Sequence, residues 1–347
     1  MIPDTELKKL NDLIINAENP LYLFDDDQDG LCAFLIFWRA TKKGKGIAIK
    51  GSPNKNTIMK NLNLSNDLLV ILDKPVLNSE DIEEVEIPIV YLDHHPLNEI
   101  NQKNLHYFNP KFKDPKDELS TAYWAYKAMK TDKWLSAIGT ISDWHIPDYI
   151  DEIQKEFPDI FTEIKNPGDA IFNSPFGVLS KAFLFSLKGS SDITKQCIKI
   201  LTRIESPYEI LNQTTSQGRF IYKHYEKMNN KYEKAIEEAS KHIDGEHFLI
   251  YIYHSTEDSF TSIISNELIY RNPNRIIIIA RIKGEKVSLS IRSWELSLPP
   301  IVKRSLENIE GTGGGHLHAC GSVINANDLD IFINNFKKYA LEELNKK

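Results

Sequence analysis

The sequence of 347 residues contains few cysteines and no long apolar run. Its cysteines, Cys32, Cys197 and Cys320, lie far apart and form no C-x-x-C pair, which argues against a zinc site or a disulfide framework. No run approaches the roughly 18 apolar residues that cross a bilayer. The N-terminal segment also lacks the apolar stretch of a signal peptide. We therefore expect a cytoplasmic protein that has no membrane partner.

A strong excess of charge of either sign is also missing. The chain has 42 Lys and Arg against 49 Asp and Glu, a formal net charge of -7, which argues against a general nucleic-acid coat protein. Hydrophobic residues make up 41% of the chain, enough to bury at least one core, so a disordered or collagen-like chain is excluded. The partner must be inferred from local motifs.

Short apolar runs alternate with helical patterns in the first third of the chain. The runs are LYLF, IAIKG, LLVILD and IPIVYLD, and the apolar helical pattern GLCAFLIFWRATKK follows the first of them. Strands that alternate with helices indicate a parallel sheet. Three of the runs end at acidic residues, Asp25, Asp73 and Asp93. Ligands of open α/β sheets bind beyond the carboxyl ends of the strands, so these residues are candidates for a site.

The rest of the chain predicts two further parts. Residues 147–177 are rich in Pro, Gly, Asp and Asn and predict irregular or loosely helical structure, and residues 217–243 predict a long, charged linker helix. Strand patterns return after residue 245, with a hairpin turn at 283–286. We predict an α/β fold with a mainly parallel sheet flanked by helices, joined by a linker helix to a smaller α/β domain. The predicted boundaries are 1–185, 186–244 and 245–347.

The most informative motif is LFDDDQDG, which contains Asp25, Asp27 and Asp29 between an apolar strand and an apolar helix. Carboxylates this close repel one another unless a cation compensates them. Mg²⁺ and Mn²⁺ prefer carboxylate oxygens, and Gly30 would let the backbone turn away tightly. The motif therefore suggests a metal site. An acidic helix N-terminus, favoured by the helix dipole, is the alternative explanation.

Further acids and histidines follow along the chain. Asp93, His94 and His95 stand together in VYLDHHP, where imidazole ligands accompany a carboxylate that can orient them. Asp73 closes LLVILD, and Asp143 ends the helical pattern AIGTISDW. Taken singly, each also suits an ordinary turn, core or surface position.

In their order along the chain, DxDxDG, a strand-end Asp, DHH and a later GTxxD resemble the motifs of the DHH family of metal-dependent phosphoesterases. Farther on, GTGGGHLHACG resembles the glycine-rich signature of the DHH-associated C-terminal domain, and VSLSIRS resembles its Arg-bearing strand. The resemblance covers nearly the whole chain. Leu23 stands where the pyrophosphatases and nano-RNases of the family carry a histidine, so the motif is more similar to RecJ-type exonucleases.

The resemblance implies two Mn²⁺ or Mg²⁺ ions in each active site. The implied ligands are Asp25, Asp27, Asp29, Asp73, His94 and Asp143. Asp73 would bridge the ions, Asp27 with help from Asp25 would bind one, and the remaining ligands would bind the other. Two such ions activate water and clamp the phosphoryl oxygens, so no protein nucleophile is needed.

The family pattern also assigns roles beyond the metal ligands. His95 would face the substrate phosphate as a catalytic residue, and Asp93 would support the histidines. In the second domain, Gly313, Gly314 and Gly315 would leave backbone N–H groups open to a phosphate or carboxylate. Arg292, His316 and His318 would donate to the same anion. A glycine-rich turn before a strand is the ordinary alternative for this run.

We therefore predict a metal-dependent phosphodiesterase, and specifically an exonuclease that releases nucleotides from single-stranded DNA or RNA. One alternative is a hydrolase of short oligonucleotides, 3′-phosphoadenosine 5′-phosphate or cyclic dinucleotides. The DxDxDG form favours the exonuclease, whereas the net charge of -7 favours small substrates. A second alternative is a non-catalytic scaffold with protein partners in a replication or repair complex.

Overall fold

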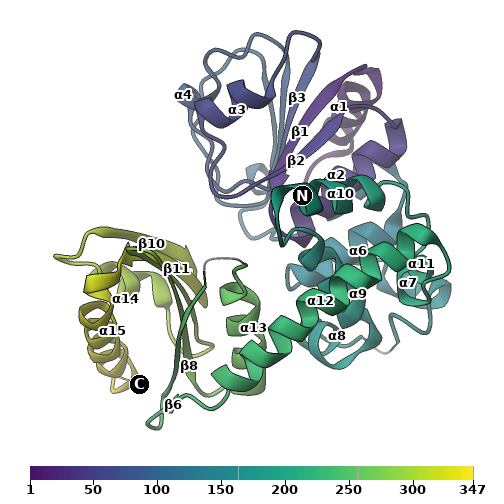
Figure 1. The fold of residues 1–347 in the computed structure, drawn as a ribbon. Helices are drawn as coiled ribbons and strands as arrows, with labels where there is room; N and C mark the ends of the chain where they lie inside the picture. The colour runs from purple at the N-terminus through teal and green to yellow at the C-terminus, as the bar shows by residue number, and fades with distance from the viewer. Residues whose placement is uncertain (163, 256–257, 347) are drawn as a thin grey trace. The chain divides into compact units, whose positions relative to one another are not determined.

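The computed structural model describes residues 1–162, 164–255 and 258–346, and it divides into two compact units, Met1–Glu226 and Lys227–Lys347 (Figure 1). The division lies inside helix α12 (Ser216–Ala239), within the region that we predicted as the linker. In the described part of the chain, no helix is both long enough and apolar enough to cross a membrane.

The first unit is built on a sheet of five parallel strands in the order β2-β1-β3-β4-β5. The strands are β1 (Pro20–Asp25), β2 (Lys45–Ile49), β3 (Leu68–Leu72), β4 (Ile89–Leu92) and β5 (Leu105–Phe108). All residues of β3 and β4 are buried, because helices cover both faces of the sheet. The predicted parallel sheet is confirmed. Strand β5 is an addition, since three of its four residues are only half-buried and its apolar run is weak.

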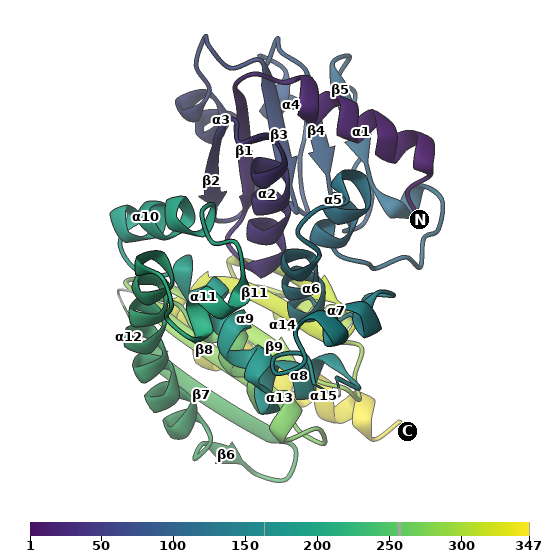
Figure 2. The same ribbon diagram turned by 90° about the vertical axis from the view of Figure 1, so that its right-hand side faces the viewer.

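Helices cover the two faces of this sheet. Figure 2 shows α1, α2 and α5 on one face, where Phe34 of α2 stacks on Phe24 of β1. The alternate residue Leu23 packs on the other face, with Ile58 of α3 and Ile82 of α4. The helices of this unit are α1 (Asp4–Asn16), α2 (Gln28–Thr41), α3 (Lys55–Asn61), α4 (Ser79–Ile82), the 3-10 helix η1 (Pro110–Phe112), α5 (Thr121–Met129), α6 (Lys133–Ser142), α7 (Ile150–Glu156), α8 (Pro167–Asn173), α9 (Pro175–Ser186), α10 (Ser191–Leu201) and α11 (Pro207–Leu211).

The stretch 147–177, expected to be irregular or loosely helical, contains α7, α8 and the start of α9. Pro167 and Pro175 stand at the first positions of α8 and α9, where a proline needs no backbone donor. Ser174 caps α9 by accepting the N–H of Phe176. Prolines that suggested irregular structure therefore begin short helices here.

The second unit has a six-stranded sheet in the order β10-β11-β9-β8-β7-β6, in which only β7 and β8 pair in parallel among the described strands. Lys283 pairs with Lys286, which confirms the predicted hairpin between β8 and β9. The elements are β6 (Ile243–Asp244), β7 (Phe248–His254), α13 (Thr261–Arg271), β8 (Ile276–Lys283), β9 (Lys286–Arg292), α14 (Leu298–Ser305), β10 (Gly311–His316), β11 (Ala319–Asn325), the 3-10 helix η2 (Ala326–Asp328) and α15 (Leu329–Leu344).

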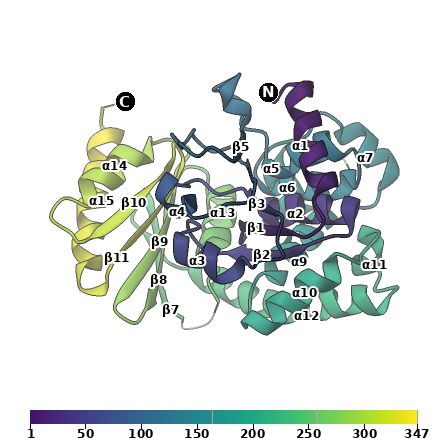
Figure 3. The same cartoon turned by 90° about the horizontal axis from the view of Figure 1, so that it is seen from above.

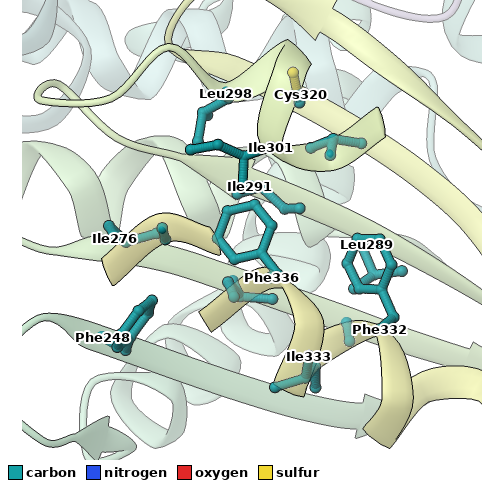
Figure 4. Close-up of a cluster of buried hydrophobic side chains, with 14 of the residues drawn as sticks. Phe248, Ile276, Leu289, Ile291, Leu298, Ile301, Cys320, Phe332, Ile333 and Phe336 are labelled. Carbon is teal, nitrogen blue, oxygen red and sulfur yellow. The ribbon is translucent and has the colours of Figure 1, made fainter. Parts of the chain in front are cut away.

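The core of the second unit lies between its sheet and the helices α14 and α15. Figure 4 shows Ile276 and Ile291 of the sheet close to Ile301 of α14 and Phe336 of α15. Helix α13 packs against β8 and β9 on the opposite face (Figure 3). Alternate residues of β9 therefore point either into this core or toward the α13 side.

Candidate metal centre

Three acidic strand ends meet at one edge of the parallel sheet. Asp25 is the last residue of β1, Asp73 directly follows β3, and Asp93 directly follows β4. Strand β1 lies between β2 and β3, so the chain order reverses here, and such switch points form ligand sites in open α/β sheets. The structure thus brings together acids that lie far apart in the sequence.

The start of α2 places the other acids of the DxDxDG motif. Asp27 caps the helix, and its Oδ1 accepts the N–H of Gly30 at 3.0 Å. Asp29 is only 2% exposed and accepts two backbone N–H groups of α5, from Thr121 at 2.7 Å and Ala122 at 2.8 Å. A Cβ on Gly30 would lie 2.7 Å from the backbone nitrogen of Asp25. Glycine is therefore required for the close approach of the helix to the strand.

His94 connects the acids of two other elements. Its Nε2 lies 3.4 Å from Oδ1 of Asp73 and 3.6 Å from Oδ2 of Asp143, the residue that ends α6. Asp73 Oδ1 also accepts the hydroxyl of Thr121 at 3.2 Å. The backbone of Asp73 has φ 57°, a left-handed conformation that is uncommon for a residue other than glycine. Strained backbone of this kind often accompanies functional sites.

Asp93 supports His95 and belongs to none of the ligand groups described below. Its Oδ1 lies 2.7 Å from Nδ1 of His95, and its Oδ2 accepts the His95 backbone N–H at 3.0 Å. Asn109 donates to the same Oδ2 at 3.3 Å. These contacts orient the imidazole of His95.

The described residues contain three overlapping groups of possible metal ligands. Within each group, the ligand atoms lie within 4.8 Å of one another. The groups are Asp25, Asp27 and Asp73; Asp29, His94 and Asp143; and Asp73, His94 and His95. Carboxylate oxygens and imidazole nitrogens are donors that suit Mn²⁺, and carboxylates alone suit Mg²⁺. These residues fit a divalent ion. The geometry also brings His95, which we assigned to the substrate, within reach of a metal.

Burial and mutual repulsion shift the pKa values of these groups. Burial, and then the charges of neighbouring aspartates, raise the pKa of Asp27 and Asp29 well above the ordinary value. Although burial disfavours its charge, Asp73 has a pKa lowered to about 2 by the hydrogen bond and charge of His94. Burial likewise opposes charge on His94, but Asp143 and Asp73 raise its pKa well above normal. A divalent ion that binds here must displace protons.

The glycine-rich run of the second unit is the edge strand β10, which is exposed along its whole length. It pairs with β11, so the alternative of a simple turn is wrong. His316 pairs with Ala319, which pairs with Arg292 of β9, so these residues share one face. Gly314 lies on the same face, and a Cβ there would meet no heavy atom within 4 Å among the residues that the structure describes.

Arg292 and the other glycines are held by the fold. Arg292 donates to Oδ1 of Asn266 in α13 at 2.7 Å and to the carbonyl of Cys320 at 3.3 Å, and burial lowers the pKa of its guanidinium to about 10. A Cβ on Gly313 would lie 2.8 Å from Val302 of α14. Gly315 has φ 145°, and its Cβ would lie 2.4 Å from the carbonyl oxygen of Ala319. Gly313 and Gly315 are thus required by packing and backbone geometry.

Two family models match the chain, and together they cover more than half of it. The DHH family, N-terminal domain, matches residues 22–159, and the DHHA1 domain matches residues 245–342.

The chain belongs to the DHH family.

Solved structures share this fold at low sequence identity. RecJ of Thermus thermophilus in complex with Mn²⁺ matches with a TM-score of 0.71 and 14% identity over 98% of this chain and 55% of that chain. An exonuclease RecJ bound to manganese matches with a TM-score of 0.65 and 14% identity over 98% of this chain and 95% of that chain. The pGpG-specific phosphodiesterase PggH of Vibrio cholerae matches with a TM-score of 0.51 and 14% identity over 95% and 99% of the two chains.

At this identity the likeness shows the fold alone. The DHH-family chain spans little more than half of the Thermus RecJ chain, at 55% of its length. Among curated proteins, none matches the sequence.

The site also contains a buried lysine that the sequence motifs do not mark. Lys74, directly after Asp73, is 1% exposed, and its Nζ lies 2.6 Å from Oδ1 of Asp25. Its position beside a strand-end acid, at the close of an apolar run, was the available signal. The neighbouring Asp26 lies near the lysines Lys50 and Lys188 and belongs to none of the three ligand groups.

Proposed function

We propose that this protein is a metal-dependent phosphodiesterase that releases nucleotides from the end of single-stranded DNA or RNA. The observation that carries the proposal is the convergence of carboxylates and imidazoles at the β1/β3 switch point of a DHH-family fold. RecJ structures with this fold contain Mn²⁺ or Mg²⁺, which supports a divalent ion of this kind.

We assign the metal ligands to two sites that share one residue. Asp25, Asp27 and Asp73 would hold one ion, and the group of Asp29, His94 and Asp143 would hold the second, with Asp73 between them. A bound pair of divalent ions activates water and neutralises charge on the phosphate. The backbone N–H groups of α5 hold Asp29 in place, so that the ligand set is preorganised.

His95 is the catalytic side chain that we place against the phosphate. Asp93 holds Nδ1, so that Nε2 is the ring nitrogen that we assign to a phosphoryl oxygen. Although burial opposes the charged ring, Asp93 and Asp73 raise the pKa of His95. A protonated imidazole can stabilise the negative charge or donate a proton to the leaving oxygen.

The DHHA1 domain is proposed to bind the body of the substrate. Arg292 and His316 share a face of the sheet with Gly314, where a Cβ would meet no heavy atom of the described residues within 4 Å, so we propose that a phosphate approaches the backbone there. Asn266 and the Cys320 carbonyl fix the guanidinium of Arg292. A preorganised donor set of this kind suits an anionic ligand.

A specific observation supports a second candidate, a hydrolase of short substrates such as dinucleotides, 3′-phosphoadenosine 5′-phosphate or cyclic dinucleotides. The pGpG-specific phosphodiesterase PggH shares the fold, and the match spans 95% of this chain and 99% of that chain. The net charge of -7 also disfavours a long polyanion. Substrate length therefore separates the two candidates.

The test is product analysis on end-labelled single strands of DNA and RNA, from a dinucleotide to about 20 nucleotides, longer than a typical single-strand site. Each substrate is incubated with Mn²⁺ or with EDTA, beside 3′-phosphoadenosine 5′-phosphate and cyclic dinucleotides. We expect mononucleotides to be released stepwise from the longer strands with Mn²⁺ only. Turnover confined to the shortest substrates would support the second candidate instead.

A matched pair of variants excludes a contaminating nuclease. Asp27→Asn removes a ligand, and Asp26→Asn changes the adjacent acid outside the ligand groups. Activity must be lost in the first and kept in the second. Activity that survives Asp27→Asn, or no activity of the wild type on any substrate, would contradict the proposal.

A further inference from the structure

Lys74 is a buried cation beside the proposed metal centre. Its side chain is 1% exposed, and its Nζ lies 2.6 Å from Oδ1 of Asp25 and 3.0 Å from the carbonyl oxygen of Ile49. A buried ammonium group is tolerated only when it is paired and hydrogen-bonded, and both conditions are met here. The pair of Lys74 and Asp25 is therefore a stable part of the site, with the ammonium group held in a fixed position.

The backbone conformation directs the consecutive side chains of Asp73 and Lys74 toward different acids and histidines of the site. The left-handed conformation of Asp73 directs its carboxylate toward His94 and Thr121, whereas Lys74 reaches Asp25. The hydroxyl of Tyr91, a fully buried residue of β4, donates to the carbonyl oxygen of Lys74. This contact anchors the turn from which the ammonium group projects.

The ion pair changes what Asp25 can offer to a metal. Its Oδ1 accepts from both Lys74 and the backbone N–H of Asp26, the latter at 2.9 Å. The ammonium charge also repels a divalent ion held by the same carboxylate. In the described part of the chain, no lysine or arginine forms an ion pair with Asp29 or Asp143 of the other group. Lys74 therefore offsets one of the three carboxylate charges of the Asp25 group and occupies one of its oxygens, whereas the carboxylates of the Asp29 group keep their full charge toward lysine and arginine in the described residues.

We infer that Lys74 is a positioning residue that makes the two metal sites unequal, so that the Asp25 site binds its ion more weakly than the Asp29 site. The inference rests on the proposed function. One ion then stays bound at the Asp29 site, and the ion beside Lys74 exchanges readily with solution. The rate of such an enzyme would depend on Mn²⁺ concentration over the range in which the weaker site fills.

The experiment is a Mn²⁺ titration of the full chain, with free Mn²⁺ followed by electron paramagnetic resonance. For the wild type we expect a tight and a weak class of site. Lys74→Met removes the charge and the hydrogen bonds, and Lys74→Gln keeps a donor without the charge. Both variants are expected to tighten the weak class about tenfold or more and leave the tight class unchanged. A merely structural role predicts weaker binding, so the direction of the change is decisive.

Lys188→Met is the matched control, because it removes a partly buried lysine 3.5 Å from Asp26 instead of Asp25. Both classes should remain within about twofold of the wild type, since Asp26 belongs to no ligand group. Thermal melting in EDTA verifies that each variant is folded. If neither Lys74 variant folds, Asp25→Asn provides the test: it should abolish the weak class only, and loss of the tight class would overturn the inference.

The remaining outcomes separate this inference from the proposed function. Two equally tight sites in the wild type, or unchanged or weakened binding in Lys74→Met and Lys74→Gln, would overturn the role of Lys74 alone. A wild type that binds no Mn²⁺ would overturn both the metal centre and this inference.

Discussion

The two units of the chain present opposite kinds of surface at their candidate sites. In the first unit, charged side chains crowd together in a buried to half-buried cluster, and hydrogen bonds from α5 and Asp93 orient Asp29 and His95. In the DHHA1 domain, β10 is exposed and carries glycines in place of side chains. The two proposed phosphate sites are therefore built differently: one concentrates charge at strand ends, and the other leaves the backbone of an edge strand accessible.

The first prediction compares substitutions at the two ends of strand β3, of which only one removes a proposed metal ligand. Asp73→Asn should lower kcat/KM by at least about 1,000-fold, because a shared ligand loses its charge. Asp67→Asn is the matched control at the amino end of the same strand, where Asp67 accepts the backbone N–H groups of Glu18 and Asn19. It should keep full activity and cost roughly 1 kcal/mol of stability. Near-wild-type kinetics of Asp73→Asn would refute the ligand assignment.

The second prediction concerns pH and the metal. The raised pKa values of Asp27 and Asp29 mean that the ion-free folded protein retains protons that the unfolded chain releases. The stabilisation from these groups is present at low pH and is lost as the pH rises through their raised pKa values. Because Mn²⁺ competes with the same protons, the increase in Tm on adding Mn²⁺ should be larger near about pH 8 than near about pH 5.5.

Differential scanning calorimetry with Mn²⁺ or EDTA at both pH values measures this difference. Asp27→Asn, which cannot release the proton, should show a smaller pH dependence. An equal increase in Tm at both pH values would exclude a protonated cluster.

The third prediction tests the proposed substrate-binding surface around β10 of the DHHA1 domain. His316→Ala should raise KM roughly tenfold with little change in kcat, because it removes a proposed substrate contact that takes no part in bond cleavage. Steady-state kinetics over a wide substrate range separate the two constants. A fall in kcat at unchanged KM would show that His316 acts in bond cleavage. The proposed division between a catalytic first unit and a substrate-binding second unit would then be wrong.

The fourth and smallest effect distinguishes adjacent glycines. Gly314→Ala adds a methyl group into open space and should leave Tm unchanged while weakening substrate binding roughly fivefold. In Gly313→Ala the new Cβ lies 2.8 Å from Val302 Cγ1, so we expect a loss of about 1 to 3 kcal/mol of stability. Binding assays and thermal melts on the pair give opposite patterns if Gly314 faces the substrate. Identical behaviour would contradict that assignment.

Some elements were readable from the sequence because their burial is complete. Strands β3 and β4 are buried along their whole length, and such parallel strands appear as continuous apolar runs. The half-buried β5 leaves no such run. The glycines of β10 were consistent with a turn as well as with a strand, because an exposed edge strand needs no apolar pattern.

In the candidate site, too, some residues could be selected from the sequence and others could not. Motif order was enough to select Asp25, Asp73 and His94, because strand-end acids and imidazoles are unusual together. The role of Lys74 was not accessible, since the local sequence does not show to which acid a lysine side chain extends. The backbone conformation of Asp73 and the position of Asp25 on the neighbouring strand decide that contact.

The sequence by itself determined the family, the alternation of strands and helices, and the residue types available for chemistry, because these depend on local pattern and motif order. Only the tertiary structure decided which acids share a ligand group, because those distances depend on the pairing of β1 with β3 and the packing of α5 and α6. It also decided that Lys74 is buried against Asp25 and that Gly314 shares a face with Arg292 and His316, where a Cβ would meet none of the described atoms within 4 Å. Contacts between residues far apart in the chain set local charge and access, and no linear motif records them.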